Sequence, residues 1–368
     1  MFHRDNKKIL IVGSGKSFHA TRWANAMSEA GFEVHFFSII PIVRPLNADV
    51  VVHEYPTSLG KLGYFSSSLK LRKILKCVGP DLVHAHYSSG NGILAVLALL
   101  GSKTPFITSL YGAEVFEFPL KSKLNYKLLN LVVKRAKFIL STSNVMANKF
   151  QSLYPNFDNV IVTPFGVDVD LFNFPSNKNK NKNKNKITIG IVKKLEEKYG
   201  IDTLIMAFKL LSEKFINNSL ELIIIGGGSQ EQKLKGIVNE LNIKDSVVFL
   251  GWVDNDKVRD YLHQMDVFVV PSRFQSESFG VAAVESQSCG LPTLVSNVGG
   301  LPEVIIDGET GFIVEPNNPK ALYEALENLL SDPEKMNEMS IAARKHVIDA
   351  FNWKDCVSQM SDIYNKSI

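Results

Sequence analysis

Short apolar runs alternate with amphipathic, helix-length stretches along almost the whole chain. Branched and aromatic apolar side chains cluster at residues 8–12, 34–38, 187–192 and 267–271. Runs of this length, bounded by glycine, proline or polar residues, predict buried strands. The repeated order of strand, loop, helix and strand predicts α/β domains built on parallel sheets.

The strand, loop and helix at residues 267–294 have the features of an anion site. The apolar run ends at Pro271, and a polar loop, residues 272–278, leads into a helix predicted to begin at Phe279 and to end near Gly290. The N–H groups in the first turn of a helix have no partner within the helix. They can therefore bind a phosphate group that lies in the loop.

Two carboxylates flank this predicted anion site. Glu277 lies in the loop, and Glu285 follows in the helix. In a sugar-nucleotide site, one carboxylate can bind hydroxyls of the sugar and the other the ribose diol, while backbone N–H groups bind the diphosphate. The alternative is one exposed loop glutamate and one solvated helix glutamate, since this spacing also occurs by chance. The surrounding sequence, PSRFQSESFGVAAVES, is more specific than the spacing.

That sequence resembles the signature of the retaining family 4 (group 1) glycosyltransferases. The resemblance extends to PFGVDVDLF at residues 164–172 and to GGLPEV and GETGF within residues 299–312. It covers nearly the whole chain and is strongest from Gly190 to Phe312. The resemblance implies the GT-B fold, an α/β architecture in which two Rossmann-like parallel-sheet domains face a cleft. It also implies transfer of a sugar from a UDP- or GDP-sugar to an acceptor hydroxyl, with retention of anomeric configuration.

Composition and resemblance together divide the chain into four parts. Residues 177–186 alternate Asn and Lys without an apolar residue, which predicts a flexible linker. No aromatic residue interleaves with these lysines, and this disfavours a nucleic-acid-binding arm. We expect an N-terminal acceptor-side domain, a linker, a C-terminal nucleotide-sugar-binding domain and a helix crossing back to the N-terminal domain, at residues 1–172, 173–186, 187–350 and 351–368.

Two lysines are candidates for binding the diphosphate. Where most relatives have Gly-Arg-Leu-x-x-x-Lys-Gly, this chain has KKLEEKYG, and Lys193 and Lys198 keep the spacing of the two cations. Lysine lacks the bidentate fork of arginine, so its contact geometry differs. If the last glycine of the family pattern is aligned with Gly200 instead, Lys194 takes the position of the family arginine. The choice between these two lysines stays open, and surface lysines on a loop are the alternative to both.

The resemblance implies further donor contacts. Glu277 would bind the sugar and Glu285 the ribose, while Lys193 and Lys198 would stabilise the leaving diphosphate as charge develops. The remaining residues expected to bind the donor are Gly15, Ser278, Phe279, Gly280, Trp252 and Val253. Either Trp252 or its neighbour would pack on the nucleotide base, with a core tryptophan as the alternative. No side chain clearly serves as a base, and a retaining reaction in which the leaving phosphate takes the acceptor proton needs none.

The first glycine-rich loop, GSGKS, invites two interpretations that its spacing excludes. A phosphate-binding P-loop needs a glycine where the chain has Leu10, ahead of Gly15. The dinucleotide-binding fingerprint that would begin at Gly13 needs a third glycine where the chain has Phe18. The resemblance provides a third interpretation, in which this loop lies near the donor phosphate and the acceptor.

Candidate acceptor-side residues follow the strands of the N-terminal half. The carboxyl ends of parallel strands point toward the ligand crevice, which makes His86 and Tyr87 candidates. His84 alternates with them and is a core histidine in the alternative interpretation. Many relatives have His-Gly-x-Asp where this chain has Tyr111 and Glu114. Tyrosine is a poor base near neutral pH, so the role of the histidine is not carried over. The glutamate either orients an acceptor hydroxyl or caps the next turn, and His19 is a further candidate.

Two basic amphipathic helices are predicted at residues 69–77 and 121–136. The apolar residues at helical spacing on one face of the second are Leu124, Leu128, Leu131 and Val132. Such helices can rest on anionic lipid, where each nearby cation adds about 1 kcal/mol. The alternative is a solvated helix whose apolar side packs on the sheet.

Composition excludes several classes of protein. The three cysteines, Cys77, Cys289 and Cys356, are odd in number and lack metal-ligand spacing, which suits a reducing compartment. No signal-peptide pattern is evident, and no apolar run reaches the roughly 18 residues of a transmembrane helix. We therefore expect a cytoplasmic protein, with peripheral contact at the inner face of the plasma membrane if the basic helices bind anionic lipid.

Neither a cofactor nor a metal ion is expected. Relatives of this kind need no metal, and the donor half has no Asp-x-Asp motif where a cation would be held. The expected partners are a nucleotide-diphosphate sugar and a lipid-linked or saccharide acceptor, in cell-surface polysaccharide or lipopolysaccharide assembly. Two alternatives are a catalytically silent GT-B protein, favoured by Tyr111 and the missing arginine, and a sugar-nucleotide epimerase, for which only His19 and His86 stand in candidate places.

Overall fold

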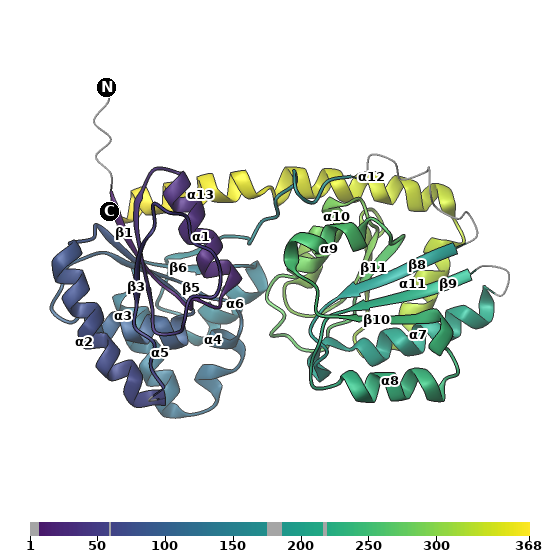
Figure 1. Ribbon diagram of the computed structural model, residues 1–368, viewed down its shortest axis with the longest axis horizontal. Coiled ribbons are helices and arrows are strands. Elements are labelled where there is room, and N and C mark those ends of the chain that lie inside the picture. Colours follow the sequence, from purple (N-terminus) through teal and green to yellow (C-terminus); the bar gives the residue numbers. More distant parts are fainter. Residues whose placement is uncertain (1–6, 59, 175–185, 216–218) are drawn as a thin grey trace, which may run out of the picture. The chain divides into compact units, whose positions relative to one another are not determined.

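A computed structural model describes residues 7–58, 60–174, 186–215 and 219–368. The chain forms two compact units, shown in Figure 1: Met1–Pro164 together with Lys354–Ile368, and Phe165–Trp353. Among the helices of the described ranges, none is both long and apolar enough to span a bilayer. Most of the Asn-Lys alternation lies outside the described residues, so the predicted linker has no structural description here.

The first unit is built on a seven-stranded parallel sheet with strand order β3-β2-β1-β4-β5-β6-β7. Its strands are β1 (Lys8–Val12), β2 (Glu33–Ser38), β3 (Val51–Glu54), β4 (Leu82–His86), β5 (Phe106–Ser109), β6 (Phe138–Ser141) and β7 (Val160–Val162). Neighbouring strands pair in parallel throughout. Parallel pairing requires a crossover between strands, and helices supply most of these crossovers, whereas a loop alone joins β2 to β3.

Helices cover both faces of this sheet. They are α1 (Phe18–Glu29), α2 (Gly60–Val78), α3 (Ile93–Ala98), α4 (Ala113–Phe116), α5 (Lys123–Arg135), α6 (Asn144–Leu153) and α13 (Trp353–Ser367), with short turns η1 (Ser88–Gly92) and η2 (Phe118–Leu120). One core joins the strands to α2, α3, α5 and α6. Figure 1 shows α1 and α13 on the opposite side of the sheet. The C-terminal helix is held there by a 2.7 Å hydrogen bond between Tyr364 and His84.

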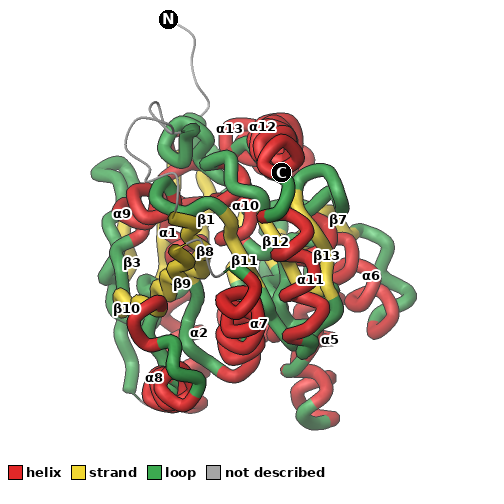
Figure 2. Tube along the Cα trace, turned by 90° about the vertical axis from the view of Figure 1, so that its right-hand side faces the viewer, coloured by secondary structure: helices red, strands yellow, loops and turns green. Residues whose placement is uncertain are grey.

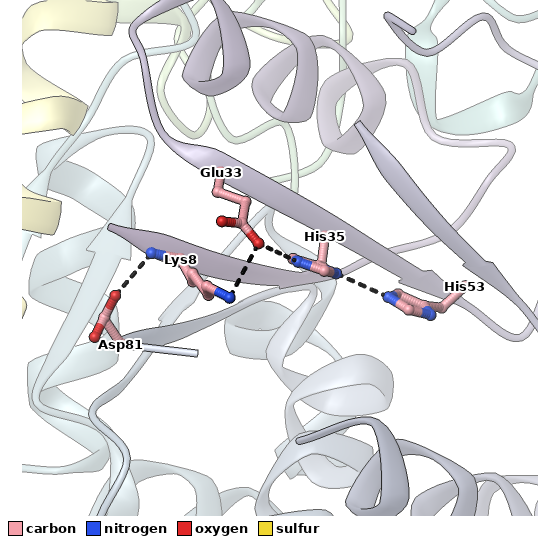
Figure 3. Close-up of polar contacts among 5 residues, drawn as sticks. All are labelled: Lys8, Glu33, His35, His53 and Asp81. Atoms are coloured by element: carbon pink, nitrogen blue, oxygen red, sulfur yellow. Dashed lines mark hydrogen bonds and ion pairs between the residues drawn. The ribbon is translucent and has the colours of Figure 1, made fainter. Parts of the chain in front are cut away.

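A chain of polar side chains crosses the strands at one side of this sheet (Figure 3). The backbone N–H of Lys8 donates to Asp81 at 2.7 Å, and its ammonium group lies 3.3 Å from Glu33. His35 lies 3.1 Å from the same carboxylate through one ring nitrogen and 3.0 Å from His53 through the other. The hydrogen bond with His35 lowers the pKa of Glu33. These contacts tie β1, β2 and the edge strand β3 together.

The second unit contains a six-stranded parallel sheet with strand order β10-β9-β8-β11-β12-β13. Its strands are β8 (Lys186–Val192), β9 (Ser219–Ile225), β10 (Val247–Gly251), β11 (Val267–Val270), β12 (Thr293–Ser296) and β13 (Gly311–Val314). Its helices are α7 (Ile201–Lys214), α8 (Glu231–Glu240), α9 (Asn255–Leu262), α10 (Val281–Ser288), α11 (Pro319–Leu330) and α12 (Pro333–Ala350), with short turns η3 (Glu197–Tyr199), η4 (Lys244–Ser246) and η5 (Leu301–Val304). Figure 2 shows α7, α8 and α11 on one side of these strands and α9 and α10 on the other.

The division between the units falls after Pro164, whereas the predicted N-terminal domain ended at Phe172. The intervening segment is held by the end of the second unit. Val167 exchanges backbone hydrogen bonds of 2.8 Å with Phe351 and Trp353. Arg344 on α12 donates to the carbonyl oxygen of Phe172 at 2.7 Å. These long-range bonds could not be read from local sequence, and they move the boundary toward the N-terminus.

Candidate functional site

The second sheet changes direction between β8 and β11. From β8 the chain continues to β9 and β10 on one side, whereas β11 leads to β12 and β13 on the other. Loops that leave two adjacent strands in opposite directions separate at the carboxyl ends of those strands, which is where open α/β sheets bind ligands. Lys193 directly follows β8, and Glu277 lies in the loop after β11. The topology therefore brings these two predicted site residues to one place.

Lys193 and Glu277 form an ion pair at this position. The ammonium nitrogen lies 2.9 Å from a carboxylate oxygen, and both side chains are mostly buried, with 14% and 13% of their surfaces exposed. The hydroxyl of Ser272 also donates to this carboxylate at 3.2 Å. Desolvation offsets much of the Coulomb attraction in such a pair, so its value to stability is small. Binding of a ligand that contacts both the Lys193 ammonium and the Glu277 carboxylate explains this mostly buried ion pair better than stability does.

The ring of Tyr199 contacts two of the predicted cations. The ammonium nitrogens of Lys193 and Lys198 are 4.7 Å and 4.9 Å from the centroid of its ring. A tyrosine ring attracts cations at this distance, so it holds the two ammonium groups near each other. Lys194, in contrast, is exposed. The geometry thus favours Lys193 over Lys194. Tyr199 is an extra residue relative to the family pattern, and its contact with both lysines was not predicted from the sequence.

The helix after the loop begins later than predicted. α10 starts at Val281 rather than Phe279, because Gly280 has a left-handed φ of +94° and forms the N-cap. Phe279 is buried against Phe165 and Phe351, with ring centroids 5.9 Å and 5.4 Å away. Its side chain is therefore part of the core, which leaves only its backbone for a ligand.

The other predicted donor-binding residues lie on the same loop, on α10 or at a neighbouring strand end. Ser278 and Glu285 are both buried, the second in the middle of α10. Trp252 is 67% exposed directly after β10, so the core-tryptophan alternative is wrong. Val253 beside it is partly buried. The N–H of Gly226 donates to the carbonyl of Gly251 at 2.7 Å, which fixes this strand end to the adjacent loop.

An Asp-x-Asp pair does occur in this half of the chain, at Asp254 and Asp256 at the start of α9. Within the part of the chain that the structure describes, no group of three or more His, Cys, Asp or Glu side chains could hold a metal ion. The prediction that no metal is needed stays a prediction.

The first sheet has its own change of direction, between β1 and β4. Here the hydroxyls of Ser17 and Tyr87 lie 3.3 Å apart. Tyr87 has a positive φ of 70°, an unfavourable conformation for a bulky residue that is often found at functional sites. Gly15 donates its N–H to Ser38 at 3.0 Å. That bond gives the glycine a structural role, and its predicted contact with the donor stays a prediction.

Three of the four predicted acceptor-side residues gather around the fourth, Tyr111. Its hydroxyl is hydrogen-bonded to Nδ1 of His86, its N–H donates to Glu114 at 3.1 Å, and the ring of His19 lies 5.9 Å away. His86 and Glu114 are buried, and each has one polar atom, Nε2 and Oε1, without a hydrogen-bond partner. His84 is a core histidine whose two nitrogens bond Tyr364 and Ser109 at 2.7 Å and 2.8 Å.

Burial controls the protonation of this cluster. It raises the pKa of Glu114 from 4.5 to about 7 and lowers the pKa of His84 from 6.5 to about 3. Burial, followed by the charges of His84 and His19, also lowers the pKa of His86 well below 6.5. Near neutral pH the histidines are neutral, and Glu114 changes its charge within the physiological range. Its carboxyl group can thus accept or hold a proton, a capacity that Tyr111 lacks.

Glu114→Gln should become more stable relative to the wild type as the pH rises from about 5 to about 8. The pKa of Glu114 in the folded protein lies above its value in the unfolded chain. Ionisation of Glu114 therefore destabilises the folded protein. This loss of stability begins near the pKa of the unfolded chain and is complete above the pKa of the folded protein. Glutamine avoids this cost. The difference in thermal midpoint between the two proteins, measured across this range, should grow by several degrees. A difference that does not vary with pH would contradict the buried carboxyl's pKa.

Comparison with known proteins identifies the family. A model described as "Glycosyl transferases group 1" matches residues 173–346, and one described as "Glycosyl transferase 4-like" matches residues 8–143. N-acetyl-alpha-D-glucosaminyl L-malate synthase from Bacillus anthracis is 26% identical over 366 residues, which cover 95% of this chain and 93% of the relative. The two models together cover most of the chain and fall in both structural units.

Solved structures show the same fold. A glycosyltransferase from Rickettsia africae ESF-5 matches with a TM-score of 0.83 at 21% identity, over 98% of each chain. HepE from Anabaena, solved in complex with UDP-glucose, matches with a TM-score of 0.79 at 19% identity, over 98% of this chain and 99% of its own. The predicted GT-B architecture of two parallel-sheet α/β domains is therefore confirmed. With both family models and this fold in agreement, the chain belongs to the group 1, GT4-type glycosyltransferases.

Proposed function

We propose that this glycosyltransferase transfers a sugar from a UDP- or GDP-sugar to an acceptor hydroxyl, with retention of anomeric configuration and without a metal ion. The observation that carries the proposal is the mostly buried ion pair of Lys193 and Glu277 at the switch point of the second sheet. Since HepE was solved with UDP-glucose, UDP-sugars are the first donors to test.

The predicted charged residues and Trp252 each have a task at this site. Lys193 and Lys198, gathered by Tyr199, would neutralise the diphosphate, together with backbone N–H groups at the start of α10. Glu277 would bind hydroxyls of the sugar while keeping its contact with Lys193. Glu285 would accept hydrogen bonds from the ribose diol, and the exposed indole of Trp252 would stack on the base.

The transfer step needs no protein base. The bond between the anomeric carbon and the β-phosphate oxygen breaks, and both electrons leave with the nucleoside diphosphate. The acceptor oxygen bonds to the same face of the anomeric carbon, and its proton passes to the departing phosphate oxygen. Lysine charges that stabilise the developing negative charge lower the barrier to this step. The proposed acceptor is lipid-linked or a saccharide, in cell-surface polysaccharide or lipopolysaccharide assembly. The free cysteines of the described chain support a cytoplasmic location for the enzyme.

One nucleotide should stabilise the protein, by roughly 5–10 °C in thermal midpoint at 100 times its dissociation constant. UDP, GDP, ADP and their sugars are compared in a chelating buffer, so that stabilisation also tests metal-free binding. Glu285→Ala should remove most of the shift because the ribose contact is lost. Glu240→Ala, a change of an exposed glutamate at the end of α8, is the matched control and should keep the shift.

A further assay separates an enzyme from a silent binder. Release of the nucleoside diphosphate upon addition of acceptor establishes transfer, and the configuration of the product at the anomeric carbon establishes retention. Binding of a nucleotide sugar without release for any lipid-linked or saccharide acceptor would support the silent GT-B protein. Stabilisation that requires a divalent cation would refute the metal-free mechanism.

A further inference from the structure

The outer face of α5 carries leucines where a solvated helix would carry polar residues. Leu124 and Leu131 are 64% and 51% exposed, and Lys127 and Lys134 lie between and beyond them. These four positions are spaced by three, four and three residues, so they follow one line along the helix. Leu120, in the turn just before the helix, is exposed as well.

A separate set of residues packs α5 onto the sheet. Leu129, Val132 and Val133 are buried in the core of the first unit. Helical spacing predicted Leu124 and Leu131 on the same apolar face as Val132, and this prediction is wrong, because both leucines are exposed and Val132 is buried. The helix is apolar on two sides, and helical spacing alone could not tell which side would face the sheet. The exposed leucines are therefore not needed for the fold.

α2 repeats this arrangement. Phe65 and Leu69 are 63% and 55% exposed, and Arg72 and Lys76 continue the same line at helical spacing. The buried residues of this helix, Leu71, Ile74 and Leu75, belong to the same core as those of α5. α3 packs against both α2 and α5, so the three helices form one layer, as Figure 1 shows. The two exposed lines lie on the outside of this layer.

The charge of this layer has a single sign. No Asp or Glu occurs between Glu54 and Asp81 or between Glu117 and Asp158. On α5 and just before it, the cations are Lys121, Lys123, Lys127, Lys134 and Arg135, and Lys121 forms an ion pair with the exposed Glu117 at 3.7 Å. On α2 the cations with defined side chains are Lys70, Arg72, Lys73 and Lys76. Along the helices themselves, apolar side chains alternate with cations, and such a face is complementary to a surface that is negative outside and apolar beneath.

We propose that this outer face of α2 and α5, defined by Phe65, Leu69, Leu120, Leu124 and Leu131 with their neighbouring cations, docks on an anionic lipid bilayer. The leucines and the phenylalanine insert below the headgroups, while the lysines snorkel to the lipid phosphates. Such docking would keep the enzyme at a membrane without a spanning helix. The inference concerns the first unit and does not depend on which sugar is transferred.

Co-sedimentation of the full-length protein with vesicles tests this inference. Vesicles of phosphatidylcholine with about 30 mol% phosphatidylglycerol should bind it at least about tenfold more strongly than phosphatidylcholine alone, and salt near 0.5 M should weaken that binding. The variant Leu124→Glu/Leu131→Glu should lose about tenfold or more in lipid affinity. The control is Ile341→Glu/Ile348→Glu on α12, a pair of exposed isoleucines at the same spacing of seven residues, which should bind as the wild type does.

Three results would overturn the proposal: no binding to anionic vesicles, equal loss in both double variants, or unchanged binding in Leu124→Glu/Leu131→Glu. Light scattering of the protein without lipid tests whether a second copy of the chain binds this face instead. A dimer that is lost in Leu124→Glu/Leu131→Glu would assign the face to dimerisation and overturn the proposal. The thermal shift with nucleotide should be the same in all of these proteins. Loss of lipid binding with an intact shift separates this inference from the proposed donor site.

Discussion

Lys193→Ala should lower kcat/KM for sugar transfer by roughly 10²–10³-fold, whereas Lys194→Ala should change it by about twofold or less. Lys193 holds a mostly buried ammonium group 2.9 Å from Glu277, at the position proposed for the leaving diphosphate. The charge that develops on the diphosphate would lose its main cation in the first variant. Lys194 is the next residue and is exposed, so the second variant controls for the loss of one lysine from the same loop. Initial rates with varied donor give kcat/KM.

A third variant separates loss of charge from loss of fold. Lys193→Arg restores the positive charge with the residue that most relatives carry, and it should recover activity to within about tenfold of the wild type. The thermal midpoint of each variant shows whether the unpaired Glu277 destabilises the unit, since breaking a buried pair costs about 3–5 kcal/mol. A folded Lys193→Ala protein with wild-type activity, or a loss confined to Lys194→Ala, would assign the diphosphate to another cation.

Most of the fold could be predicted because its signals are local. Short apolar runs such as 8–12 and 267–270 became buried strands, and helical patterns between them became crossovers. Three features depended on contacts distant in sequence and were predicted wrongly. The first is the boundary near Pro164, where Arg344 binds the following segment to the second unit. The second is the start of α10, which Gly280 places later than predicted. The third is the side of α5 that faces the sheet.

The candidate site divides in the same way. Sequence spacing placed Glu277 and Lys193 in loops, but only the strand order brings those loops together, because β8 and β11 are adjacent in the sheet and distant in the chain. The side-chain partners of a residue such as Tyr199 cannot be read from spacing, since they depend on how the turn before α7 folds. Likewise, the burial of His86 and its bond with Tyr111 required the packing of β4 against β5.

The loop that carries Glu277 is fixed by two glycines outside it. The N–H of Gly299 donates to the side chain of Gln275 at 2.9 Å, and the N–H of Gly300 donates to the carbonyl oxygen of Glu277 at 2.8 Å. Gly299 has a left-handed φ of +54°, and a Cβ atom there would overlap that same carbonyl oxygen. Any other residue at this position must displace the loop. The backbone of this turn therefore sets how close Glu277 comes to Lys193.

Gly299→Ala should lower the thermal midpoint by about 6 °C or more and remove most transfer activity, whereas Gly308→Ala should cost about 2–4 °C and leave activity near wild type. Gly308 also has a positive φ, +77°, but no atom lies within 4 Å of its added Cβ. Both variants thus share the strain of a left-handed alanine, and only the first adds the overlap with Glu277. Scanning calorimetry and kcat/KM well below both midpoints provide the comparison. Equal losses of thermal midpoint and of activity in the two variants would contradict this prediction. The loop would then adapt to the alanine without moving the Glu277 carboxylate, whose position would be set by Lys193 and Ser272 alone.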